Sequence, residues 1–117
     1  MIESISAVTL FCSDVRVSIG FYESLGFEMI YGGENEPLTS FRVGEGFLNL
    51  IESDDQDGSS TWGRVIIHVS NVDDMHARCL ANGWHPSTEP TNAPWGERYF
   101  HIRDPAGHEI SFARVLD

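Results

Sequence analysis

The sequence has few cysteines, few basic residues and no long apolar stretch, and each shortage excludes a class of protein. Its 117 residues include two cysteines and seven Lys and Arg residues, against 18 Asp and Glu residues. No apolar run approaches the roughly 20 residues that a membrane-spanning helix needs. Residues 1–3 lack the basic start and apolar run of a signal peptide. We therefore expect no membrane partner and a cytoplasmic location.

The formal net charge of −11 bears on the partners of the protein. Nucleic-acid binding requires a basic surface against the phosphates, so we expect no nucleic-acid partner. An acidic surface attracts cationic ligands, although it is also typical of a soluble protein without any specific partner. Cys12 and Cys79 each lie within an apolar pattern, which favours buried free thiols in a reducing compartment over a disulfide.

An internal repeat organises the chain, which has the length of one domain and, with 41% hydrophobic residues, enough apolar surface for a core. Residues 13–15 (Ser-Asp-Val) align with residues 70–72 (Ser-Asn-Val) at an offset of 57, and Gly26 then aligns with Gly83. Each copy reads as an apolar β run, a short side chain that caps a helix, about eleven helical residues and a glycine stop.

Each predicted helix is preceded by one strand and followed by three shorter ones. The predicted strands are residues 5–12, 28–31, 39–43 and 47–52 in the first copy and 65–69, 85–89, 98–103 and 109–114 in the second. Neither copy alone can bury both its helix and the other face of its sheet. We therefore predict a single α+β domain over residues 1–117, with two βαβββ modules (4–53 and 62–115) and a polar linker at 54–61. The modules would form a cupped mixed sheet with the helices on its outer faces.

Several motifs resemble a known family. Residues 21–27 (Phe-Tyr-Glu-Ser-Leu-Gly-Phe), after the capping Asp14, resemble the first helix of the vicinal oxygen chelate superfamily of glyoxalase I, extradiol dioxygenases, and fosfomycin and bleomycin resistance proteins. Residues 95–100 (Trp-Gly-Glu-Arg-Tyr-Phe) and 103–107 (Arg-Asp-Pro-Ala-Gly) are especially similar to the bleomycin resistance branch. The resemblance spans nearly the whole chain. It implies an antibiotic-resistance type of function and a homodimer whose ligand clefts involve both subunits.

The resemblance also identifies four positions to compare with metal ligands. The enzymes of this superfamily bind one divalent metal with four side chains of the inner sheet face. The corresponding residues here are Ala7, Asn49, Arg64 and Ser111, and none of them is His, Glu or Gln. Alanine has no lone pair, and arginine has no acceptor and a permanent charge. A unit charge about 4 Å from a divalent ion costs on the order of 8 kcal/mol at an effective dielectric near 20. We therefore expect no metal and no other cofactor, which argues against the usual enzymes without deciding whether the protein is one.

Strand alternation predicts which side chains line the cup, because every second residue of a strand lies on the same face. Ile110 and Phe112 would face the helices, whereas Arg64, Ile66 and His68 would face the cup. A mixture of apolar walls and a few polar groups is typical of a ligand pocket. The candidate ligand-binding residues are Phe11, Asn49, Arg64, His68, Trp95, Tyr99, Glu109 and Ser111.

Each of the more suggestive residues has a structural interpretation as well. Arg64 and Glu109 would either contact a ligand or pair with each other across the cup. His68 is either catalytic or a hydrogen-bonded core histidine. Trp95, in a loop with Pro and Gly, would either stack on a planar or cationic ligand or cover the strand ends.

Three functions are consistent with these residues. The first is metal-independent binding or sequestration of a small organic molecule, with a cationic drug as one candidate. The second is a metalloenzyme of the same superfamily (a lyase, isomerase or dioxygenase) with a displaced metal, bound by His68 and Glu109 together with His101 or Tyr99. The third is a metal-free enzyme in which His68 or Glu109 is the general base and Arg64 stabilises an anion. The missing metal ligands favour the first.

Overall fold

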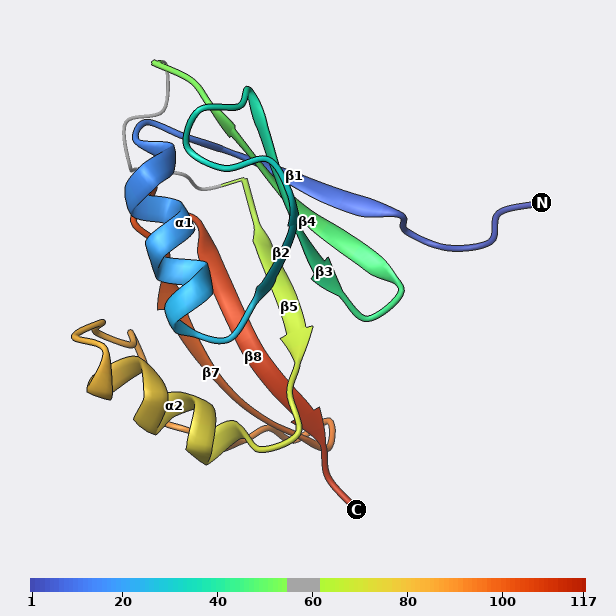
Figure 1. Ribbon diagram of the computed structural model, residues 1–117. Coiled ribbons are helices and arrows are strands. Elements are labelled where there is room, and N and C mark those ends of the chain that lie inside the picture. The colour runs from blue at the N-terminus through green and yellow to red at the C-terminus, as the bar shows by residue number, and fades with distance from the viewer. Residues whose placement is uncertain (55–61) are drawn as a thin grey trace.

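The computed structural model of the protein describes residues 1–54 and 62–117. Each half of the described chain forms one four-stranded sheet and one helix (Figure 1). The first half contains β1 (Ala7–Cys12), α1 (Val15–Ser24), β2 (Glu28–Tyr31), β3 (Leu38–Val43) and β4 (Gly46–Glu52). The second contains β5 (Arg64–His68), α2 (Val72–Ala81), β6 (Thr91–Asn92), β7 (Glu97–Arg103) and β8 (Glu109–Val115). The α+β class and the doubled βαβββ order are confirmed, whereas the predicted linker lies, except for Asp54, outside the described residues.

The two sheets have equivalent topologies. The strand orders are β1-β4-β3-β2 and β5-β8-β7-β6, with a parallel pair at β1–β4 and at β5–β8 and antiparallel pairs elsewhere. Thr9 pairs with Asn49 in the first sheet, and Ile66 pairs with Ser111 in the second. Because Thr9 and Ile66 are 57 positions apart, Asn49 and Ser111 are structurally equivalent, as the sequence alignment predicts.

The helices begin and end where the repeat predicts. Asp14 accepts a hydrogen bond from the Arg16 backbone N–H at 3.1 Å, and Asn71 accepts one from the Asp74 N–H at 3.0 Å. These side chains satisfy N–H groups that have no partner within the first helical turn. Gly83 has a φ of +82°, a left-handed conformation that glycine adopts without strain.

One predicted strand is wrong. Residues 85–89 form no regular strand, and the sheet instead ends in the short strand β6. Pro86 and Pro90 have no backbone N–H to donate to a strand ladder. The segment lies beside β7 through irregular bonds, from the Ser87 N–H to the His101 carbonyl (2.8 Å) and from the His101 N–H to Thr88 Oγ1 (2.9 Å).

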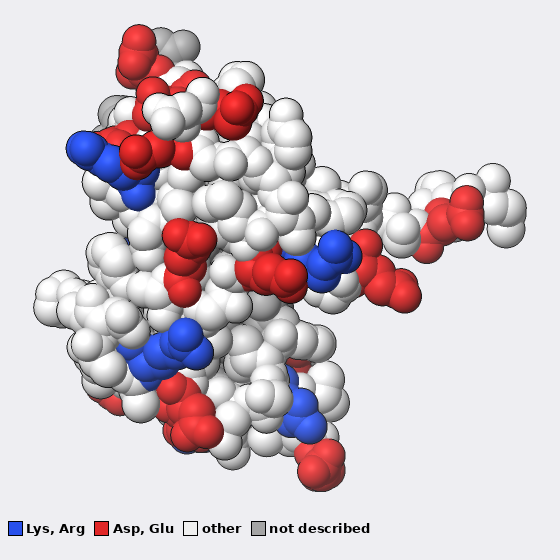
Figure 2. All heavy atoms as spheres, in the orientation of Figure 1, with Lys and Arg blue, Asp and Glu red and all other residues white. Residues whose placement is uncertain are grey.

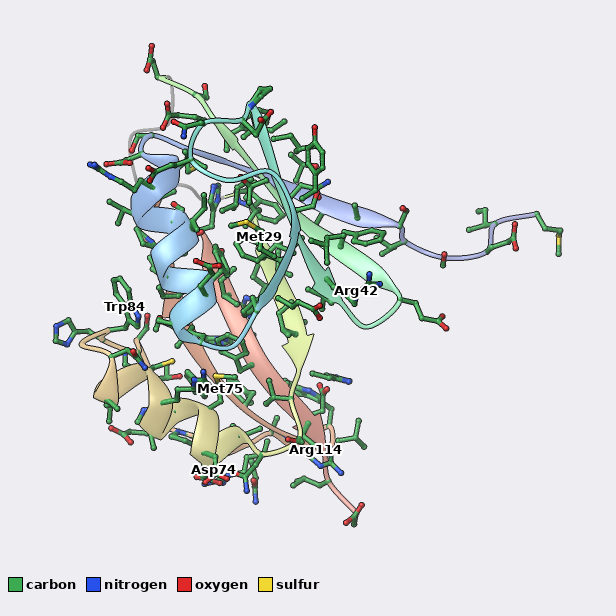
Figure 3. All side chains as sticks on the ribbon, in the orientation of Figure 1. Met29, Arg42, Asp74, Met75, Trp84 and Arg114 are labelled. Carbon is green, nitrogen blue, oxygen red and sulfur yellow. The ribbon has the colours of Figure 1, made fainter. Side chains whose placement is uncertain are left out.

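One apolar core joins the two halves on the helix side of the sheets. The Phe21 ring meets the Trp84 ring edge to face at 5.0 Å between centroids. Trp84 follows α2 and points toward α1 (Figure 3), where its indole N–H donates to Ser24 Oγ at 2.8 Å. The fully buried Ile110 and Phe112 lie on this side, as strand alternation predicts.

Buried polar contacts fix the halves relative to each other. The Tyr22 hydroxyl donates to Asp104 Oδ2 at 2.6 Å, and Asp104 Oδ1 accepts from the His108 backbone N–H at 2.8 Å. The His108 ring lies 2.6 Å from the Phe11 carbonyl through Nε2 and 2.8 Å from the Trp62 indole N–H through Nδ1. Since a carbonyl only accepts and an indole N–H only donates, the ring is the neutral tautomer with its proton on Nε2. His108 directly follows the turn between β7 and β8 and is buried.

Candidate functional site

The sheet faces opposite the helices, called here the inner face, expose apolar residues to solvent. On β1 the side chain of Leu10 is 2% exposed, whereas the adjacent Phe11 is 49% exposed. On β5 the corresponding values are 9% for Ile67 and 58% for Ile66. Alternate residues of each strand therefore serve the core and the inner face.

The inner face of the second sheet carries a pocket of about 290 Å³, called here the inner pocket. It is formed by side chains of β5, β7 and β8, three strands that lie side by side, and by the loop before β7. Its lining residues are Arg64, Ile66, Trp95, Glu97, Tyr99, His101, Ser111 and Ala113. A volume near the lower end of the usual range for ligand sites suits a small molecule or one part of a larger molecule.

Arg64 and Glu109 form an ion pair beside the inner pocket. Arg64 Nε donates to Glu109 Oε2 at 2.7 Å, between directly paired residues of β5 and β8. The sequence left open whether these two side chains pair or contact a ligand, and the structure shows the pair. The charges of the two groups therefore offset each other at this position.

His101 and Ser111 form a second polar contact, within the inner pocket. His101 Nδ1 lies 2.6 Å from Ser111 Oγ, between directly paired residues of β7 and β8. Burial, and then the positive charge of Arg64, lower the pKa of His101, while Glu109 opposes the shift. The lowered pKa favours the neutral form of the imidazole. The ring is also the hydrogen-bond partner of the buried Ser111 hydroxyl.

Glu97 also lines the inner pocket, although the sequence did not predict it as a site residue. Its Oε1 accepts from the Trp95 indole N–H at 2.9 Å, and its Oε2 lies 3.1 Å from His68 Nε2. It therefore connects two of the predicted residues, one on β5 and one in the loop before β7. The signal that could have found it is strand parity, because Glu97 shares a face of β7 with Tyr99 and His101.

Aromatic rings form a row along the inner pocket. The Trp95 and Tyr99 rings are stacked, with centroids 6.0 Å apart and planes 22° from parallel, and the His101 ring lies 5.0 Å from the Tyr99 ring. Trp95 remains 70% exposed. Stacked rings with an open face provide a binding surface for a flat ligand.

The predicted site residues divide into two groups. Arg64, Trp95, Tyr99 and Ser111 line the inner pocket, and Glu109 and His68 contact its lining residues. Phe11 and Asn49 lie on the first sheet and do not line it. Asn49 is bonded there to Ser40 Oγ at 2.6 Å and to Thr9 Oγ1 at 3.3 Å.

The residues at the four expected metal positions do not fit a divalent cation. Ala7 offers no donor atom, Arg64 is a cation already paired with Glu109, and Asn49 and Ser111 are neutral groups bonded to neighbours. The alternative set is not assembled either, because His68 contacts Glu97 rather than Glu109. Among residues 1–54 and 62–117, no three His, Cys, Asp or Glu side chains are grouped as metal ligands would be.

An apolar groove of about 390 Å³ lies between β1 and β5, which are edge strands of the two described sheets. Its walls include Ile5, Phe47, Trp62 and Val65. Residues 1–6 continue beyond it, away from the body of the molecule (Figure 1), and Ile2 and Ile5 are 100% and 81% exposed. In the described part of the chain, neither helix is long and apolar enough to cross a membrane.

The fold has many solved relatives. A bleomycin resistance determinant encoded on the transposon Tn5 aligns over 97% of this chain and 98% of its own, with a TM-score of 0.80 and 17% identity. Lactoylglutathione lyase from Agrobacterium tumefaciens aligns over 97% and 94%, with a TM-score of 0.78 and 21% identity. A bleomycin-binding protein in complex with bleomycin aligns over 97% of this chain and 98% of its own, with a TM-score of 0.76 and 17% identity. These identities show a common fold alone.

The sequence itself gives the family. No curated protein matches the chain. The family model described as the Glyoxalase/Bleomycin resistance protein/Dioxygenase superfamily matches residues 4–112, which include both helices and almost all of the two sheets. The chain therefore belongs to the glyoxalase/bleomycin resistance protein/dioxygenase superfamily.

Proposed function

We propose that this protein binds a small organic molecule in the inner pocket without a metal ion, and so sequesters or carries it. The observation that carries the proposal is the aromatic row of Trp95 and Tyr99 in a pocket whose polar groups are bonded to one another rather than directed at a common metal. Apolar walls with a few fixed polar groups favour binding of an organic ligand.

A structural relative indicates the kind of ligand to test first. The bleomycin-binding protein that shares this fold was crystallised with bleomycin. Metal-free bleomycin is therefore the first candidate ligand, and a role in antibiotic resistance would follow from its binding. The excess of acidic over basic residues favours cationic ligands in general.

We further propose that the protein is a homodimer, located in the cytoplasm. Phe11 and Ile66 are exposed on the inner face, Ile2 and Ile5 are exposed near the N-terminus, and an apolar groove lies between β1 and β5. Exposed apolar surface of this kind is typical of an interface. A partner subunit would cover it and could bring Phe11 and Asn49 of its first sheet to the inner pocket.

Isothermal titration calorimetry tests the binding function. The ligands are metal-free bleomycin and a set of small planar compounds. We expect at least one to bind, and Trp95→Leu and Tyr99→Leu to weaken that binding about tenfold, since each removes one stacking ring. Tyr31→Leu, an exposed tyrosine of β2 outside the inner pocket, is the matched control.

Two results would contradict the proposal. The first is full affinity in both pocket variants, which would place binding elsewhere. The second is about one equivalent of Ni, Zn, Fe or Mn per chain in elemental analysis of untagged protein, because it would require a ligand set that the inner pocket does not provide.

A further inference from the structure

Glu97 is the charged group of the inner pocket whose described contacts include no permanently charged side chain. Arg64 is paired with Glu109, so these two charges offset each other. Glu97 is held by the Trp95 indole, which is neutral, and by the His68 imidazole, which is charged only when protonated. With a neutral imidazole, the pocket therefore carries one uncompensated negative charge.

The carboxylate of Glu97 lies beside the aromatic row. The indole N–H that bonds to Glu97 belongs to the ring that stacks on Tyr99. The side chain of Glu97 is 24% exposed, which is enough for contact with a ligand, while its two hydrogen bonds hold its orientation. The indole N–H lies in the plane of its ring, so the carboxylate lies at the edge of the row and leaves the ring faces open. A carboxylate beside ring faces that carry negative potential is a combination that attracts organic cations.

We propose that Trp95, Glu97 and Tyr99 form a recognition site for organic cations in which the positive charge is part of, or attached to, a flat ring system. The ring system stacks on the Trp95–Tyr99 row, and the charge lies against the Glu97 carboxylate. This inference rests on the proposed function, because it assigns the class of ligand that the inner pocket takes.

The general acidity of the protein does not supply such a site. Acidic side chains are spread over the face of the molecule shown in Figure 2 rather than gathered in one patch. Charges that are dispersed and exposed to water raise the local concentration of cations but are screened within about 10 Å at 0.1 M salt. Glu97 differs from them because it is oriented by two hydrogen bonds and lies inside a pocket.

The test compares two probes of nearly equal shape, 1-methylquinolinium and 4-methylquinoline, by calorimetry at pH 8, where the second is neutral. We expect the cation to bind the wild-type protein about fivefold or more tightly than the neutral probe. Glu97→Gln should remove that preference while keeping the affinity for the neutral probe, because the amide retains an acceptor for the indole N–H. Glu36→Gln, in the turn between β2 and β3, removes the same unit of charge outside the pocket and should leave the preference unchanged.

Each possible outcome decides one of the two proposals. Equal binding of the two probes to the wild type, or an unchanged preference in Glu97→Gln, overturns the cation site but leaves an organic-ligand pocket. Binding of neither probe overturns the cation site. Bleomycin and the other planar compounds then decide the binding function separately. Loss of the preference in both variants would assign it to net charge and would also overturn the cation site.

Discussion

At the scale of single residues, Tyr22 and Asp104 show how a family motif becomes a structural contact. The tyrosine follows the middle of α1 and the aspartate opens the turn between β7 and β8, 82 positions later, yet their side chains meet at 2.6 Å in the core. Burial, and then the negative charge of Asp104, raise the pKa of Tyr22 well above its ordinary value, so the hydroxyl remains a donor. The sequence shows both residues as motif members, but their pairing depends on how the two halves pack.

Tyr22→Phe should destabilise the protein by about 1–3 kcal/mol. The substitution keeps the ring in the core but removes the hydroxyl donor, and the buried carboxylate of Asp104 loses one partner. Urea unfolding measures the change in the free energy of unfolding. Tyr31→Phe, whose side chain is 58% exposed on β2, should change it by less than about 0.5 kcal/mol. Equal stabilities of the two variants would contradict the structural role of the Tyr22 hydroxyl.

His101 should give the protein a stability that falls as the pH is lowered. Its pKa in the folded protein lies below the ordinary value of 6.5, chiefly because burial disfavours the charged ring. The unfolded chain therefore takes up the proton first, so stability is complete above pH 6.5 and declines as the pH falls from there toward the folded-state pKa.

Histidine resonances followed by NMR between pH 8 and 4.5 measure that pKa. We expect the pKa of His101 to lie below 6.5, and His101→Gln to reduce the loss of stability between pH 7 and 5. A titration of His101 above 6.5 would show that the ring is not buried as the structure describes.

At the scale of elements, the repeat in the sequence predicts both helices closely, because their capping and stop signals are local. α1 and α2 begin 57 positions apart and each has an Asx cap. The prediction of a strand at 85–89 is wrong for a reason that is also local, because Pro86 and Pro90 have no backbone N–H to donate. Whether a segment with two prolines still joins a sheet depends on the neighbouring strand. β7 begins at Glu97, one residue earlier than predicted, and this residue belongs to the side chains of β7 that line the inner pocket.

Two glycine substitutions should change stability in opposite directions. Gly83 has a left-handed φ with open space around the position of an added Cβ, so Gly83→Ala should cost about 1 kcal/mol from backbone strain. Gly20 lies within α1, also with open space, so Gly20→Ala should stabilise by about 0.5–1 kcal/mol. Thermal and urea unfolding of both variants measures these changes. A stabilising Gly83→Ala would contradict the helix-stop geometry.

At the scale of the whole molecule, the sequence predicts two similar halves but does not predict which apolar surfaces of these halves remain exposed. The apolar residues exposed on the inner face and near the N-terminus lead us to expect self-association. Sedimentation equilibrium of the wild type should give the mass of a dimer.

Charged substitutions locate the interface. Ile5→Asp should shift the equilibrium toward the monomer by about tenfold or more in the dissociation constant, because it places a charge at the apolar groove. Leu80→Asp introduces the same charge at an exposed leucine of α2 and should leave the mass unchanged. A monomeric wild type, or an equal effect of the two variants, would contradict an interface at the groove.

The sequence shows which residues occupy the four positions where the family enzymes place metal ligands, because an alignment of motifs identifies those positions. The proposed ligand-binding surface is harder to predict from the sequence, because it depends on contacts between β5, β7 and the loop before β7. Trp95 is conspicuous by its size, whereas Glu97 acquires a role only through its bonds to Trp95 and His68.

Backbone amide NMR of the ¹⁵N-labelled protein tests most directly whether the inner pocket is an organic-ligand site, as we propose. Planar cationic, neutral and anionic compounds would be added in turn, and the shifted amides mapped onto the chain. We predict that the compounds that bind shift amides of β5, β7 and β8 and the Trp95 indole N–H, with the largest effects from cations. Shifts confined to the groove between β1 and β5, or no shift with any compound, would contradict that proposal.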